Sequence, residues 1–216
     1  MRSHFDEQLA LLNKELVQMG ALCEEVISLT SQALTLGSPT LAKKVAHIDA
    51  EIDQKERTIE TMCLRLLLQQ QPVARDLRQI SAALKIITDM ERIGDQAEDI
   101  SEIIIFLNGQ TIQNGSILQK MAEAVSKMVT GSVDAYVKHD IILAEKVIAG
   151  DDTVDDFFEE VKRMLIEKIA ENPTDGECAL DFLMIAKYFE RIGDHAVNIA
   201  EWVIFSVTGV HKEENS

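Results

Sequence analysis

The chain has 216 residues, of which 46% are apolar but only 5% aromatic, and its formal net charge at pH 7 is −16. This composition favours a helical core of Leu, Ile, Val, Ala and Met over a β-sheet. The acidic surface argues against a nucleic-acid partner, because phosphate backbones are recognised by clusters of Lys and Arg that the sequence lacks.

The cysteines and the N-terminus indicate the compartment. Cys23, Cys63 and Cys178 are isolated and form no C-x-x-C pair, which predicts neither a disulfide framework nor a thiolate zinc site. Residues 1–7 carry acids where a signal peptide needs an apolar core, and no apolar run approaches the ~18 residues of a membrane-spanning helix. We therefore expect a soluble cytoplasmic protein that does not insert directly into a membrane.

Apolar residues recur at helical spacing along nearly the whole chain, with interruptions at Gly and Pro. Ser38 and Pro39 suit the N-cap and first position of a helix, and Pro72 is expected to open another. Thr174 and Glu177 match a capping box, which predicts Thr174 as the N-cap of the last helix. The predicted helices span about 4–36, 39–70, 72–108, 116–138, 140–171 and 174–208.

The segment 109–115 is the best linker candidate, because it is polar apart from Ile112 and contains an Asn-Gly pair. It divides the chain into two units of three helices, residues 1–109 and 116–210, and residues 211–216 are expected to be a frayed tail. The predicted fold class is therefore all-α, with two tandem three-helix bundles related by internal duplication.

One motif makes the duplication visible. The pentapeptide Glu-Arg-Ile-Gly-Asp occupies residues 91–95 and returns unchanged at 190–194. Upstream, at a slightly different offset, Met19 matches Met121 and Asp49 matches Asp151. Two related halves therefore each carry the same pair of acids.

In both copies the Glu and the Asp lie one turn apart on one face of a helix. At 100° per residue, the acids that follow Glu91 fall within an arc of about 100°, opposite an apolar stripe. A solvated face is the simpler interpretation of one such stripe. Like charges at this spacing nevertheless cost roughly 0.2–0.5 kcal/mol per pair, and a helical glycine costs about 1 kcal/mol relative to Ala. Gly94 and Gly193 therefore indicate close approach of another helix or a ligand, and a cation site is favoured.

The available ligands indicate which cation would bind. Carboxylate and amide oxygens favour Mg²⁺, Ca²⁺, Mn²⁺ or iron over zinc. His195 points away from Asp194 and is interpreted as a hydrogen-bonding or interface residue, and Arg92 and Arg191 as ion pairs between neighbouring helices. The second and fifth helices can add ligands, although alone their acids are typical of a solvated surface; these acids are Asp49, Asp53, Asp151 and Asp155.

Known catalytic patterns are missing. A ferritin-like di-iron site requires Glu-x-x-His, but Gly stands three residues after Glu91 and after Glu190. The sequence has no G-x-S-x-G, Walker loop or H-E-x-x-H, and exposed carboxylates lack the apolar surroundings that raise a pKa for acid catalysis. We therefore predict that the protein is not an enzyme.

The runs 74–78, 89–95, 189–196 and 198–201 closely resemble the PhoU family of phosphate-signalling proteins, and the resemblance covers essentially the whole chain. It implies a cytoplasmic bacterial protein of two three-helix bundles, often a homodimer, that binds metal clusters on the bundle surface. By position, the resemblance implies metal ligation by Glu91, Asp95 and Asp99 in the first half and by Glu190, Asp194 and Asn198 in the second.

The resemblance further implies a regulator without catalysis. Such a protein damps high-affinity phosphate uptake and the starvation response, acting with the phosphate ABC transporter ATPase and often a phosphate-sensing histidine kinase. Because Asn198 stands where the first half has Asp99, the two metal sites are expected to differ in charge and affinity. Two alternatives stay open, a metal-dependent carboxylate-bridged enzyme and an inert helical scaffold.

Overall fold

The computed structural model describes residues 2–69, 73–110 and 116–210. Within these residues it contains long helices and no strand, which confirms the all-α prediction. A short 3₁₀ turn, η1 (Pro173–Asp175), precedes the last helix. The α-helices are α1 (Arg2–Leu36), α2 (Pro39–Gln69), α3 (Ala74–Leu107), α4 (Ser116–Lys138), α5 (Ile141–Glu171) and α6 (Gly176–Thr208).

Most helix ends lie where the sequence predicts them. Gly37 has a φ of 55° and ends α1, since a residue without a Cβ enters the left-handed region easily. Ser38 then caps α2, because its Oγ accepts a bond from the Leu41 amide at 3.4 Å. The predicted helix start at Pro72, the predicted tail 211–216 and most of the predicted linker lie outside the described residues.

The capping-box prediction at Thr174 is wrong. Asn172, not Thr174, caps this turn, because its Oδ1 accepts bonds from the Thr174 amide at 3.3 Å and the Thr174 hydroxyl at 2.7 Å. Pro173 fixes the first position of the 3₁₀ turn, so the chain is already turning when it reaches Thr174. The helix α6 begins only at Gly176, and its N-cap Asp175 makes no side-chain cap bond.

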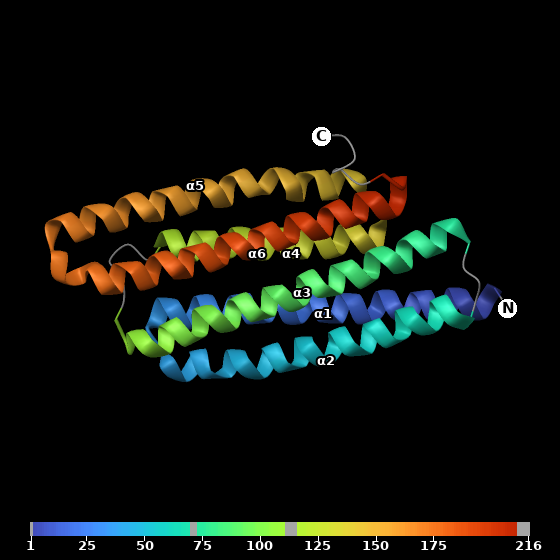
Figure 1. The fold of residues 1–216 in the computed structure, drawn as a ribbon, viewed down its shortest axis with the longest axis horizontal. Helices are drawn as coiled ribbons and strands as arrows, with labels where there is room; N and C mark the ends of the chain where they lie inside the picture. The colour runs from blue at the N-terminus through green and yellow to red at the C-terminus, as the bar shows by residue number, and fades with distance from the viewer. Residues whose placement is uncertain (1, 70–72, 111–115, 211–216) are drawn as a thin grey trace.

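The helices form two three-helix groups that share one core. Helices α1, α2 and α3 pack together, α4, α5 and α6 do the same, and α3 lies along α6 while α1 lies along α4 (Figure 1). The contact between α3 and α6 is the most extensive of any helix pair in the described chain. Both copies of the repeated motif therefore lie on helices at the centre of the molecule. No helix of the described residues is long and apolar enough to cross a membrane.

Candidate metal-binding faces

The first acidic face lies where α2 crosses the motif of α3. Asp49 of α2 is only 9% exposed, and its Oδ1 is buried without a hydrogen-bond partner in the described structure. A Cβ placed on Gly94 would lie 2.5 Å from that oxygen. The glycine of the motif therefore makes room for the Asp49 carboxylate, which is the close approach that the sequence indicates.

Neighbouring acids make this position unfavourable for a charged carboxylate. The pKa of Asp49 is raised to about 7, first by burial and then by the charges of neighbouring acids, in decreasing order Glu98, Asp53, Asp95 and Glu91. Burial also raises the pKa of Glu91, with Asp95 the next cause. Carboxylates from α2 and α3 thus share one strongly negative region, in which a cation would be stabilised.

Asp99 lies at the border of this region. Burial raises its pKa, followed by the charges of Glu102 and Asp95, whereas Arg191 of α6 lowers it. Of the predicted first-half ligands, Asp49, Asp53, Glu91 and Asp95 act on one another's charge, and Asp99 is coupled both to Asp95 and to Arg191 of α6.

The second face repeats this arrangement between α5 and α6. The Oδ1 of Asp151 is buried without a hydrogen-bond partner in the described residues, and a Cβ on Gly193 would lie 3.4 Å from it. The pKa of Asp151 is raised to about 6, first by burial and then by the charges of neighbouring acids, which are Asp155, Asp194, Asp152 and Glu190. The structure therefore brings together the four predicted acids Asp151, Asp155, Glu190 and Asp194.

Asn198 makes a hydrogen bond to the other half of the molecule. Its amide nitrogen donates to Oδ1 of Asp89 on α3 at 3.1 Å, and Nδ1 of His195 lies 2.9 Å from the same oxygen. This pair confirms His195 as a hydrogen-bonding residue at the interface between the halves. Asn198 shares that interface role, although the resemblance implies a metal ligand at this position.

Basic side chains already pair with the acids of both faces, and on the first face Nη2 of Arg57 lies 3.2 Å from Asp53 on α2. Nη1 of Arg92 lies 2.8 Å from Asp95 and its Nε lies 3.5 Å from Glu91, both on the same helix. In the second half Lys187 pairs with Glu190. The prediction of an ion pair between helices is wrong for Arg92, because residues three apart share one helix face. Arg191 instead lies 5.9 Å from the ring centroid of Tyr188.

The donor chemistry of both faces fits a hard cation. All the grouped ligands are carboxylates, and each face has one buried oxygen that no hydrogen bond satisfies. In the described part of the chain, however, no three His, Cys, Asp or Glu side chains stand close enough together to hold a metal ion as they are. Ligation therefore requires rotation of these side chains, with Arg92 and Lys187 withdrawing from the motif acids.

Two acids of the first face were missing from the predicted ligands. Glu98 contributes more than any other charge to the raised pKa of Asp49, and the pKa of Glu56 on α2 is also raised by burial and by Glu60 and Asp53. The sequence could have identified Glu98, because helical spacing places it on the same face of the helix as Glu91. Glu56 follows Asp53 by three residues, which places both acids on one helix face.

Comparison with known proteins identifies the family. The PhoU domain family model matches residues 16–104 and again 118–203. The phosphate-specific transport system accessory protein PhoU homolog of Clostridium acetobutylicum is 35% identical over 99% of both chains. PhoU homolog 1 of Thermotoga maritima is 33% identical and covers 98% of this chain and 92% of its own length.

Solved structures agree with this assignment. The crystal structure of PhoU from Pseudomonas aeruginosa superposes with a TM-score of 0.90 at 36% identity, over 95% of this chain and all of that one. PhoU from Streptococcus pneumoniae, at 24% identity, shares the fold with a TM-score of 0.87 over 96% of this chain and 98% of that chain. With one domain matched in each half and relatives aligned almost end to end, this chain belongs to the PhoU family.

Proposed function

We propose that this protein is a non-enzymatic regulator of phosphate uptake and phosphate-starvation signalling. It acts negatively on the high-affinity phosphate ABC transporter, through the transporter ATPase and an associated phosphate-sensing histidine kinase. The observation that carries this proposal is the end-to-end similarity to proteins named as accessory proteins of the phosphate-specific transport system. Both copies of the Glu-Arg-Ile-Gly-Asp motif lie inside the matched domains.

The proposal includes a homodimer in the cytoplasm that carries metal on its two carboxylate faces. Iron, Mn, Mg and Ca suit these oxygen donors better than zinc. The buried oxygens of Asp49 and Asp151 support this part, since each lacks a partner that a cation would supply. The metal would be held by Asp49, Asp53, Glu91 and Asp95 in one half and by Asp151, Asp155, Glu190 and Asp194 in the other.

Deletion of the gene tests the regulatory role. We expect the deleted strain, grown in plentiful phosphate, to import labelled phosphate at least several-fold faster than the parent strain and to express its starvation genes. A plasmid copy of the wild-type gene restores both values. Unchanged uptake and unchanged starvation-gene output in the deleted strain would contradict the proposal.

A further inference from the structure

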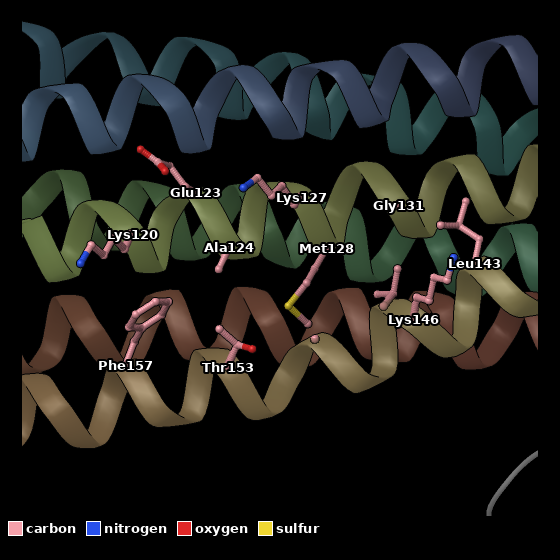
Figure 2. A pocket seen from close by; sticks show the side chains of 12 residues that line it. Lys120, Glu123, Ala124, Lys127, Met128, Gly131, Leu143, Lys146, Thr153 and Phe157 are labelled. Atoms are coloured by element: carbon pink, nitrogen blue, oxygen red, sulfur yellow. The ribbon is translucent and has the colours of Figure 1, made fainter.

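A groove of about 470 Å³ runs between α4 and α5 (Figure 2). Its floor is apolar, because Met128 and Val147 are buried there and Phe157 is half-buried. Gly131 and Gly150 also line the groove and contribute no side chain. The side chain of Met128 extends from α4 toward α5, so the groove exposes an apolar strip between two helices.

Lysines surround this strip in an otherwise acidic protein. Lys120 and Lys127 of α4 and Lys146 of α5 line the groove, whereas Glu123 is its one acid. All three lysines are exposed, and none pairs with a carboxylate in the described part of the chain. Because the whole chain carries −16, this local excess of positive charge marks the groove as a surface for an acidic partner.

The first half of the duplication lacks most of these features. At the offset that aligns Asp49 with Asp151, bulky or oppositely charged residues replace those of the groove: Leu29 for Gly131, Ile48 for Gly150, Glu25 for Lys127 and Lys55 for Phe157. Between α1 and α2, the Nζ of Lys55 donates to Glu15 and Gln18 of α1, each at 2.6 Å, so the positive charge at this position is already paired. The shared fold therefore does not require the glycines or Lys127 at these positions.

We propose that this groove docks an acidic amphipathic helix of a partner protein. The apolar face of the partner helix packs on the half-buried Leu143 and Phe157, and its flanking carboxylates meet the three lysines. The groove suits a helix because its lining residues on α4, from Lys120 to Gly131, extend over about 17 Å, or three helical turns. This inference builds on the proposed function, since a regulator without catalysis acts through contacts with other proteins.

A designed peptide tests the groove directly. The probe is a fluorescein-labelled helix of four turns, with Leu on one face at positions i, i+3, i+4 and i+7 and Glu along both borders. We expect fluorescence anisotropy to show micromolar binding to the wild-type protein. Lys127→Glu combined with Lys146→Glu weakens binding at least tenfold, and a peptide with Lys in place of Glu binds at least tenfold more weakly.

A matched control separates the groove from the total charge. Lys14→Glu with Lys44→Glu changes the net charge equally at exposed sites of the first half, and Lys44 is the repeat counterpart of Lys146. This control leaves binding within twofold of wild type. Thr153→Trp, at an exposed position lining the groove, abolishes binding by filling it, while circular dichroism confirms the helical fold.

Three outcomes would overturn the inference. Equal weakening by the control pair would show general electrostatics instead of a site. Binding to phosphatidylglycerol vesicles that depends on Lys127 and Lys146, without peptide binding, would assign the groove to a lipid surface. Dissociation of a homodimer by the same substitutions, seen by sedimentation, would assign it to a second copy.

The outcome is separable from that of the proposed function, because the peptide is measured on purified protein and phosphate uptake is measured in cells. If deletion derepresses uptake but the peptide fails to bind, only the groove inference is wrong. If the peptide binds as expected but deletion leaves uptake unchanged, the groove stands and the proposed function is wrong.

Discussion

Asp49 combines burial with the charge of several neighbouring acids, so it binds a proton more tightly in the folded chain than in the unfolded one. Its pKa of about 7 lies well above the ordinary value of about 3.9 for an unfolded aspartate. Between these two pH values the folded state holds a proton that the unfolded state has released. The free energy of unfolding of the metal-free protein therefore falls as the pH rises through this range.

Asp49→Asn removes this titration. We expect the variant to be more stable than wild type at pH 8 by about 1 kcal/mol or more, and the difference to shrink toward pH 5. The measurement is urea unfolding in EDTA at pH 5, 6.5 and 8. Asp6→Asn, at an exposed site, is the control and keeps the wild-type pH dependence. A pH slope in Asp49→Asn equal to that of wild type would exclude Asp49 as its source.

At the scale of the helices, the two motif glycines are not equivalent. A Cβ on Gly94 meets the Asp49 carboxylate at 2.5 Å and the end of Ile52 at 3.2 Å, so these side chains of α2 have to move, whereas a Cβ on Gly193 reaches Asp151 only at 3.4 Å, an ordinary contact. The same pentapeptide therefore lies at a tight crossing of α2 and α3 in the first half and at a looser crossing of α5 and α6 in the second.

Paired alanine substitutions measure this difference. Gly193→Ala gains helix propensity and stabilises the protein by up to about 1 kcal/mol. In Gly94→Ala the new methyl group clashes with Asp49, which offsets the gain in helix propensity. We expect this variant to be less stable than Gly193→Ala by about 1–2 kcal/mol. Urea unfolding of both variants at pH 7.5 gives the comparison. Equal changes in the two variants would mean that the two crossings are equally open.

The sequence predicts the helices well because Gly37, Pro39 and the Asn-Gly linker interrupt a strong helical period. It also places the motif acids on one face, since helical geometry alone determines the angle between their side chains around the helix axis. It does not show which helices meet, so the bond from His195 to Asp89 of the other half could not be specified. Thr174 shows a second limit, because the Asn172 side chain caps a 3₁₀ turn that begins at Pro173 and takes up Thr174 before α6 starts.

At the scale of the whole molecule, the two carboxylate faces predict stabilisation by metal. We expect saturating Mn²⁺ or Fe²⁺, at about 100 times Kd, to add about 2.7 kcal/mol per site at pH 7.5. The gain is smaller at pH 5.5, because protons compete for carboxylates whose pKa values burial raises to about 7 and about 6. Thermal unfolding with and without metal, together with elemental analysis, measures both effects.

Variants assign the two sites separately. Glu91→Gln with Asp95→Asn removes the metal of the first face, and Glu190→Gln with Asp194→Asn removes that of the second. Asp134→Asn, at an exposed acid that pairs with Lys138 of its own helix, is the control and retains the full metal content. Absence of any bound metal in the wild-type protein would favour the inert scaffold over the metal-carrying regulator.

The long contact between α3 and α6 has a consequence for how the molecule unfolds. Each half buries apolar side chains of its motif helix against the other half, so neither half can melt without exposing part of its neighbour's core. The two units repeat each other in sequence, but neither is expected to unfold independently of the other. We therefore expect heat to unfold the chain in one cooperative transition, and a destabilising substitution in either half to lower the melting temperature of both.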